Sequence, residues 1–398
     1  MNKLIRHSLI ALFHVFLAFS LLLPDPKSAV GSNGECAHSL IARLPEPSDK
    51  AEALIEIAKL YLHEGDKESS DKLLVEALYW TAQIEEDLFK AGAIGAISKV
   101  GSIDQVELAA EIAKTLRGSN GAWAAQALIG AYARLGLNDR ASERLREAVA
   151  ATRSANTRSE TWYGDREHEL SMILSEGARA GLTEQVLKLK GGVKDEYMQG
   201  DVLRTAAVTL VEQQQPDRAI NLARSIYYEI ERINALVDVA NAAARIGDKS
   251  SASKALSFAL RETRRDIFDP EQDTKTKALV SISLAYEKNG QRAEALSVLE
   301  QAEKVGHTIE KPGFKDSGMA EIALAFARFG IFHQALRVTE NIPNPWSGIK
   351  VHTLASIAGY LTEAGDQEQT ASVLDNAFQV ARDIDCAYFK YSSSAQSC

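Results

Sequence analysis

The chain of 398 residues carries 45 Lys and Arg against 54 Asp and Glu, a formal net charge of −9 at pH 7. A nucleic-acid-binding surface needs clustered positive charge, so this balance argues against a nucleic-acid partner. Hydrophobic residues make up 45% of the sequence and aromatic residues only 7%, which is typical of a folded protein whose helices approach each other closely through alanine.

The first 31 residues have the pattern of a signal peptide. Lys3 and Arg6 precede an apolar run from Leu9 to Leu23, and Ala29-Val30-Gly31 supplies small residues for cleavage. The run is shorter than the roughly 20 residues that a membrane-spanning helix needs. We therefore expect an exported protein, periplasmic or extracellular, that meets a membrane only if segment 1–31 stays uncleaved. Residues 32–49 are expected to form a linker.

From residue 50 to residue 382 one helical pattern returns nine times. Apolar residues at i, i+3, i+4 and i+7 predict a first helix, and an Ala-rich second helix follows a turn. The turn carries a Gly in eight copies, Gly65, Gly101, Gly136, Gly181, Gly247, Gly290, Gly330 and Gly365, and Gln214 in the ninth. A Gly there predicts a left-handed residue that caps the first helix and reverses the chain. A small residue follows five places later in most copies, and we expect it between the two helices: Ser70, Ala141, Ala219, Ala252, Ala295 and Ala335.

Four copies show the pattern clearly and begin at Leu54, Leu128, Leu236 and Leu279; two of them read Leu128-Ile129-Tyr132-Gly136-Ala141-Leu145-Ala148 and Leu279-Ile282-Tyr286-Gly290-Ala295-Leu299-Ala302. They resemble the tetratricopeptide repeat family, whose unit is a helix–turn–helix of 34 residues. The resemblance covers roughly residues 50 to 382, although the family's Trp at the fourth place and its terminal Pro are missing. It implies an all-α, right-handed α-solenoid of about nine antiparallel helix hairpins, with a groove that binds a protein or peptide.

Basic residues stand two places before the turn residue in six copies: Lys99, Arg134, Arg179, Arg245, Lys288 and Arg328. In the resembled family this face lines the groove, where a ladder of cations would hold an acidic peptide. The alternative is structural, because a cation near a helix C-terminus is favoured by the helix dipole by about 0.3–1 kcal/mol. Arg204 and Asn241 also occupy groove positions, and Val208, Val237 and Val280 beside them indicate a partly apolar groove.

Three long intervals between copies contain aromatic residues, Trp162, Phe268 and Phe314, which either contact a partner or pack onto the next repeat. The tail, residues 383–398, holds Cys386 and Cys398, which either form a disulfide in an oxidising compartment or stay unpaired. We expect Glu167-His168-Glu169 to lie on a solvated helix face. The sequence has no Cys/His cluster with zinc spacing and no cofactor or catalytic motif, so we expect no metal, no cofactor and no enzyme activity.

The sequence therefore predicts an exported scaffold that binds a protein or peptide partner through its groove, for example in a bacterial envelope complex. The main alternative is a module that binds a small molecule or a glycan in the same groove. Self-assembly through the ends of the array, and an enzyme whose site lacks a recognisable motif, remain open.

Overall fold

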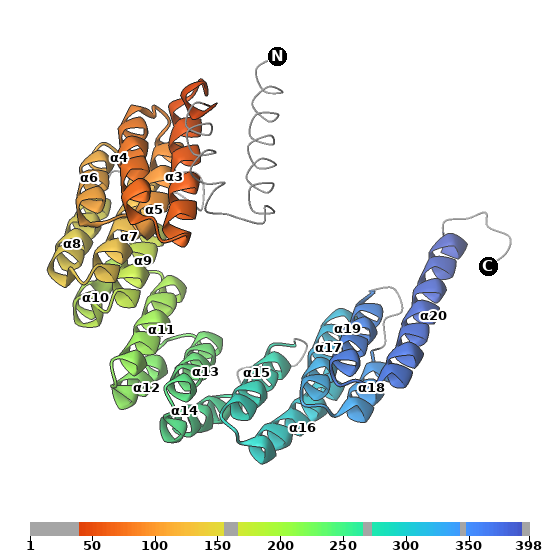
Figure 1. Ribbon diagram of the computed structural model, residues 1–398. Helices are drawn as coiled ribbons and strands as arrows, with labels where there is room; N and C mark the ends of the chain where they lie inside the picture. Colours follow the sequence, from red (N-terminus) through yellow and green to blue (C-terminus); the bar gives the residue numbers. More distant parts are fainter. Residues whose placement is uncertain (1–39, 155–165, 266–272, 343–347, 392–398) are drawn as a thin grey trace. The chain divides into compact units, whose positions relative to one another are not determined.

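The computed structural model describes residues 40–154, 166–265, 273–342 and 348–391, with side chains up to residue 384. Within these ranges the regular elements are eighteen α-helices and one short 3-10 helix, without a strand, so the all-α prediction is confirmed. The chain divides into two compact units, residues 1–194 and residues 195–398. Figure 1 shows consecutive helices packed side by side within each unit.

The first unit contains α3 (Pro47–His63), α4 (Lys67–Gln83), α5 (Asp87–Val100), α6 (Ile103–Ala113), α7 (Gly118–Arg134), α8 (Asn138–Ser154), α9 (Arg166–Arg179), α10 (Thr183–Leu189) and η2 (Lys190–Gly192). The second contains α11 (Glu196–Glu212), α12 (Pro216–Arg224), α13 (Glu229–Arg245), α14 (Lys249–Glu262), α15 (Thr274–Lys288), α16 (Arg292–Thr308), α17 (Pro312–Arg328), α18 (Phe332–Glu340), α19 (Ile349–Glu363) and α20 (Gln367–Tyr391). They form helix hairpins, each with a first helix (α3, α5 and so on) and a second helix (α4, α6 and so on).

The turn between the two helices of a hairpin explains the recurring glycine. Gly65, for example, has a φ of +83°, and its N–H donates to Leu62 O while the N–H of Asp66 donates to Tyr61 O. This pair of bonds is the Schellman motif, which satisfies carbonyls that the helix end would otherwise leave open. The same two bonds recur at the other left-handed turns: Gly136, Gly181, Gln214, Gly247, Gly290, Gly330 and Gly365.

An aspartate directly after the turn glycine begins the second helix in three hairpins. The Oδ1 atoms of Asp66, Asp248 and Asp366 accept backbone N–H groups three residues later, each at 3.0 Å. Such N-caps satisfy one of the free N–H groups at a helix start. The bond from the Ser69 N–H also lowers the pKa of Asp66 below its ordinary value. Glycine and aspartate together thus end one helix and start the next.

Gly101 is the exception, and the prediction of a left-handed turn there is wrong. Its φ is −65° with a ψ of 153°, which is extended backbone. The second helix, α6, starts almost directly after Gly101. Gln105 Oε1 accepts the N–H of Ser102 at 2.8 Å, so a side chain of α6 satisfies a backbone N–H at the start of the same helix. The chain therefore leaves α5 without the Schellman bonds, and the last carbonyls of α5 need another donor.

The small residues that follow the turns lie where the pattern predicts. Ser70 is 1% exposed, and the five alanines at the same place are fully buried: Ala141, Ala219, Ala252, Ala295 and Ala335. Within each unit, each first helix packs against its own second helix and against the next first helix. The first helices therefore form a continuous layer in each unit, and their outward face is where a groove can form.

The first full hairpin begins with α3 at Pro47, and the last helix, α20, ends at Tyr391; the bounds of the repeat domain, residues 50 and 382, stay a prediction. The signal peptide, Trp162, Phe268, Cys36 and Cys398 lie outside the described residues, and so does the side chain of Cys386. None of the helices in the described part of the chain is both long and apolar enough to cross a membrane. The handedness of the solenoid stays a prediction.

Candidate binding groove on the first helices

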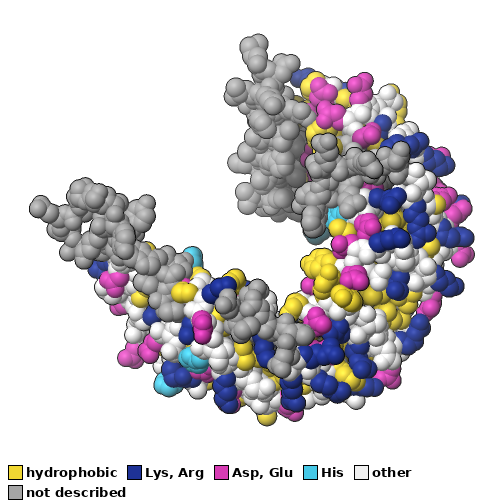
Figure 2. Space-filling model, turned by 180° about the vertical axis from the view of Figure 1, so that it is seen from behind, with side chains coloured by type: hydrophobic (Ala, Val, Ile, Leu, Met, Phe, Trp, Pro, Cys, Tyr) yellow, Lys and Arg dark blue, Asp and Glu magenta, His cyan; other side chains and the backbone are white. Residues whose placement is uncertain are grey.

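The six basic residues of the predicted ladder all lie exposed in the last turn of a first helix. Three of them contact a neighbour in the same unit: Arg179 lies 3.0 Å from Glu176, Arg245 lies 3.6 Å from Glu212, and the Nε of Arg328 donates to the Tyr360 hydroxyl at 2.8 Å. Exposed pairs of this kind contribute little to stability. On the face shown in Figure 2, Lys and Arg side chains intermingle with Asp and Glu.

Arg134 supplies the donor that the end of α5 lacks. Its Nη2 donates to Gly101 O at 2.7 Å and to Ser98 O at 3.2 Å. These carbonyls belong to the preceding hairpin, whose turn has no Schellman motif. Arg134 therefore has a structural contact of a kind that the sequence did not predict, since it caps the end of a neighbouring helix. By contrast, Lys99 and Lys288 have no ion-pair or hydrogen-bond partner among the described residues.

Hydrogen bonds to backbone carbonyls of an adjacent hairpin also occur in the second unit. The Nδ2 of Asn289 donates to Lys249 O at 3.2 Å, and the Nη2 of Arg292 donates to Phe329 O at 2.6 Å. Each bond joins consecutive hairpins, so the helix layers are held in register by polar contacts as well as by apolar packing.

Of the other predicted groove residues, Arg204 lies on α11 and Asn241 on α13 of the second unit. Arg204 forms an ion pair with Asp238, and its Nε lies 2.5 Å from the Asp238 Oδ2. The positive charge of Arg204 is therefore balanced by a carboxylate of the protein itself. Asn241 has a buried Oδ1 that finds no hydrogen-bond partner in the described part of the chain. Val237 and Val280 are only 8% and 3% exposed, so these two valines belong to the core and do not form the apolar groove that was expected.

Two carboxyl groups on the same pair of helices are partly desolvated. Burial raises the pKa of Asp201, and burial together with the nearby charge of Asp201 raises the pKa of Glu231. Tyr197 lies beside them, because both carboxylates raise the pKa of its hydroxyl. Elsewhere, the expectation that Glu169 is solvated is wrong: it is 2% exposed and accepts the Ser119 hydroxyl at 2.8 Å.

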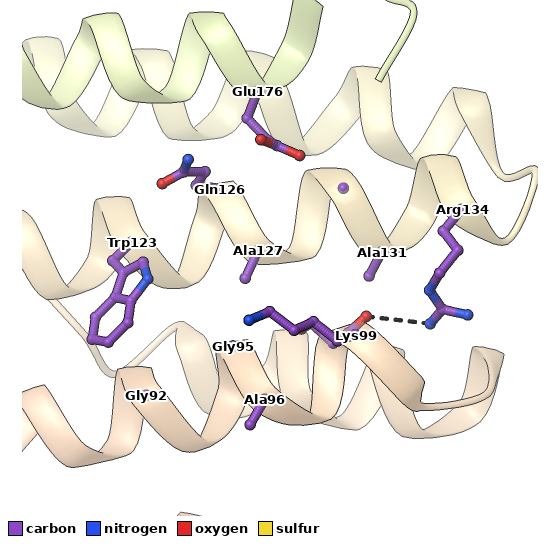
Figure 3. Close-up of a pocket in the computed structure, with 12 residues that line it drawn as sticks. Gly92, Gly95, Ala96, Lys99, Trp123, Gln126, Ala127, Ala131, Arg134 and Glu176 are labelled. Atoms are coloured by element: carbon purple, nitrogen blue, oxygen red, sulfur yellow. Dashed lines mark hydrogen bonds between the residues drawn. The ribbon is translucent and has the colours of Figure 1, made fainter. Parts of the chain in front are cut away.

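A pocket of about 470 Å³ opens on the first-helix layer of the first unit, and we call it the groove pocket. Its lining comes from α5, α7 and α9 only (Figure 3). Two facing stripes form it, with the spacing of one helix face: Gly92, Gly95, Ala96 and Lys99 on α5, and Trp123, Ala127, Gly130, Ala131 and Arg134 on α7. Gln126, Glu176 and Ser98 complete the lining.

The floor of the groove pocket is made of glycine and alanine. Glycine inside a helix costs roughly 0.5–1 kcal/mol relative to alanine, yet α5 carries two and α7 carries one in this floor. At Gly95 a Cβ would meet only the Ala127 Cβ, at 3.9 Å, and at Gly92 it would meet the Trp123 ring at 3.7 Å. Side chains this small leave the floor shallow and half-buried at Gly92, Ala96 and Gly130, whereas Gly95 is buried.

The two ends of the groove pocket differ in chemistry. Trp123, which is 41% exposed, stands at one end above Gly92, and Arg134 stands at the other end (Figure 3). The two residues are eleven positions apart on α7, which corresponds to about 16 Å along the helix. The Lys99 side chain points back along the groove, between Gly95 and Ala127, as the N-terminal tilt of helical side chains favours.

Glu176 of α9 forms the remaining wall together with Gln126. One oxygen of Glu176 pairs with Arg179 at 3.0 Å, and the other is so close to α7 that a Cβ at Gly130 would lie 2.6 Å from it. Glycine at position 130 is thus what lets this carboxylate lie over the α7 backbone. Ser98 is 2% exposed, and its hydroxyl has no hydrogen-bond partner among the described residues.

Two further pockets occur among the described residues. One, of about 370 Å³, lies between α7, α8, α9 and the α6–α7 turn. The other, of about 500 Å³, lies between α18 and α20. Neither combines an exposed indole with an unpaired cation. No group of His, Cys, Asp and Glu that could hold a metal ion occurs among the described residues.

Sequence reasoning identified Lys99 and Arg134 but missed the rest of the groove pocket. The repeat register placed the two cations, since both stand two places before the turn. Trp123, Gln126 and Glu176 have no counterpart in the repeat pattern. The available signal was the three glycines at positions 92, 95 and 130, which interrupt helices at groove-facing spacing without serving a turn.

The fold and this groove define an all-α protein of tandem helix hairpins that resemble tetratricopeptide repeats. No protein-family model and no curated protein matches the chain. Among solved structures, Ton1535 from Thermococcus onnurineus NA1 is 15% identical, with a TM-score of 0.36 and coverage of 88% of this chain and 99% of that one.

Two other solved structures are similar at the same level. The apo form of the quorum sensor NprR from B. thuringiensis is 10% identical, with a TM-score of 0.32 and coverage of 83% of this chain and 98% of that one. A Rap protein complexed with Competence and Sporulation Factor is 12% identical, with a TM-score of 0.29 and coverage of 85% and 99%. At TM-scores this low the likeness carries no information on ligands.

Proposed function

We propose that the chain is a non-catalytic scaffold that binds a protein or peptide segment in the groove pocket of its first unit. The observation that supports this proposal is the pocket itself, which combines a floor of glycine and alanine with an exposed indole at one end and an unpaired lysine along the floor. A tryptophan with a free face is a frequent anchor in protein interfaces. An open groove with a single unpaired cation offers no water-excluded pair of groups for acid–base chemistry.

Photo-crosslinking from inside the groove tests this proposal. A photoreactive phenylalanine analogue replaces Gln126, which lines the pocket, in cells that make the chain naturally. The matched control places the same analogue at Tyr79, which is 60% exposed on the second helix α4. We expect a discrete protein adduct at position 126 that is absent at position 79. Equal adduct patterns at both positions, or no protein adduct at position 126, would contradict the proposal.

The same preparation addresses the small-molecule or glycan alternative. Native mass spectrometry of the chain purified without washing at high salt would reveal a retained ligand as a fixed mass increment. A retained small molecule that raises the melting temperature progressively as its concentration increases, and that is lost when Trp123 is replaced by Ala, would favour the alternative over a protein partner.

We also propose that the chain is exported, on the strength of the positive, apolar and small-residue segments within residues 1–31. Cell fractionation followed by N-terminal sequencing tests this. A mature N-terminus shortly after residue 31 in the exported fraction is the expected result, and an intact N-terminus in the cytoplasmic fraction would contradict it.

A further inference from the structure

We infer that the segment bound in the groove pocket is extended and carries an acidic side chain within about three residues of a bulky apolar one. This inference rests on the proposed function and names the chemistry of its partner. Four features of the pocket support it: the floor of glycine and alanine, the polar wall of Gln126 and Glu176, the unpaired Lys99 and the indole of Trp123.

The floor and the polar wall favour an extended backbone over a helical one. In an extended segment the N–H and C=O groups point outward and need partners, whereas a helix satisfies its own. Gln126 offers both an amide donor and an acceptor, and the Glu176 oxygen beside Gly130 offers a further acceptor. The floor carries no side chain longer than a methyl group at Gly92 and Ala96, so the ligand backbone can approach these groups beside the Lys99 side chain, which lies between Gly95 and Ala127 (Figure 3).

The charge of Lys99 is what selects an acid. Arg134 is bound to the carbonyls of Ser98 and Gly101, and Glu176 is paired with Arg179. Lys99 therefore remains as the charged residue of the described lining that has no ion-pair or hydrogen-bond partner, and its ammonium group points along the floor (Figure 3). A carboxylate on the ligand would form a charge-assisted hydrogen bond there.

The indole of Trp123 selects the apolar neighbour, and the helix geometry sets the spacing. Trp123 stands over Gly92, which lies seven residues before Lys99 on α5, or about 10 Å along the helix axis. An extended chain covers about 3.3 Å per residue, so about three residues span the distance. Because the Lys99 side chain reaches back toward the indole, the spacing is three residues or fewer.

A random peptide display library tests the inference, with the purified chain as bait. Parallel selections use the wild type, Trp123→Ala and Lys99→Glu, and the controls are Tyr79→Ala on α4 and Lys188→Glu on α10. Trp123, Lys99, Tyr79 and Lys188 are all exposed, so the fold should survive each change, and circular dichroism checks this. Peptides count as groove binders when Trp123→Ala removes them and Tyr79→Ala does not.

We expect groove binders to be enriched in Asp or Glu within three positions of Leu, Ile, Phe or Trp. Lys99→Glu should weaken the best such peptide about tenfold in fluorescence anisotropy, through lost attraction and added repulsion, and should enrich Lys or Arg instead. Lys188→Glu should leave the affinity unchanged. Raising the salt concentration should weaken binding by the wild type.

The outcomes distinguish a failure of this inference from a failure of the proposed function. Groove binders without acidic enrichment, or with an affinity indifferent to Lys99→Glu, would overturn this inference and leave the proposed function standing. If no peptide depends on Trp123, or if the library yields nothing and a glycan array does, the proposed function itself fails. Groove binders that fold into a helix when bound would overturn the extended conformation.

Discussion

Replacing Gln214 with glycine should stabilise the second unit. Gln214 is the one described non-glycine residue with a positive φ, at +61°, and it holds the turn position between α11 and α12. A left-handed conformation costs a residue with a Cβ roughly 1–2 kcal/mol. Glycine avoids this cost but loses about 0.5–1 kcal/mol through its greater freedom in the unfolded chain. The net gain for Gln214→Gly is therefore about 0.5–1 kcal/mol.

The next hairpin provides the reverse experiment. Gly247 occupies the same turn position with a φ of +82°, and a Cβ there would meet no atom within 4 Å. Gly247→Gln should therefore destabilise the unit by a similar amount, through backbone conformation alone and without a clash.

Urea denaturation followed by circular dichroism measures both variants, as a shift of the midpoint at constant slope. Differential scanning calorimetry should show melting temperatures that move in opposite directions by about 1–4 °C. If Gln214→Gly lowers the stability, the Gln214 side chain makes a contact that outweighs the backbone strain. If both variants are neutral, the left-handed turns do not carry the cost assigned to them, and the reasoning is refuted.

Three other predictions concern single side chains. Arg134→Ala should lower the free energy of unfolding by about 1–2 kcal/mol because two carbonyls at the end of α5 lose their donor; an unchanged urea midpoint would show that water replaces it. Gly359→Ala on α19 should raise the free energy of unfolding by about 0.5–1 kcal/mol, because the position is inside a helix and a Cβ there meets nothing within 4 Å. A lower urea midpoint would contradict this. Burial, together with the charge and hydrogen bond of Glu107, raises the pKa of Tyr132 to about 12. The folded state therefore keeps the phenol protonated at pH values where the unfolded state has lost the proton. As a result, the free energy of unfolding should fall as pH rises from about 10 to 12. An ultraviolet titration should show a phenol that ionises near pH 12 and that is absent from Tyr132→Phe; the same titration curve in both proteins would refute the assignment.

The helix hairpins could be predicted from sequence because their determinants are local. A residue with positive φ after a helix favours glycine, and apolar spacing marks the buried face, so one residue in each copy fixes the register. The prediction failed at Gly101 because a glycine after a helix can adopt either a left-handed or an extended backbone. The bond between Gln105 and Ser102 starts α6 immediately, and the left-handed turn is then not needed.

The groove pocket could be predicted only in part, because it depends on which faces of neighbouring helices meet. The repeat register correctly placed Lys99 and Arg134 on one face. It could not show that Arg134 is bound to the end of α5 and Lys99 is not, because this depends on the missing Schellman turn one hairpin earlier. Glu176 enters the site from a third helix, and only the spatial packing of α9 on α7 brings it there.

The bond between Arg134 and the end of α5 limits how freely this chain can gain or lose repeats. A tandem array grows by inserting or deleting whole hairpins, and this is tolerated when each hairpin completes its own turn. The hairpin of α5 and α6 does not, since its open carbonyls are satisfied by a side chain of the following hairpin. An extra hairpin between α6 and α7 would separate donor from acceptor, so the neighbours α5 and α7 must stay neighbours. The same pair of helices carries the floor of the groove pocket, and rearrangement of the array is thereby restricted where its candidate binding surface lies.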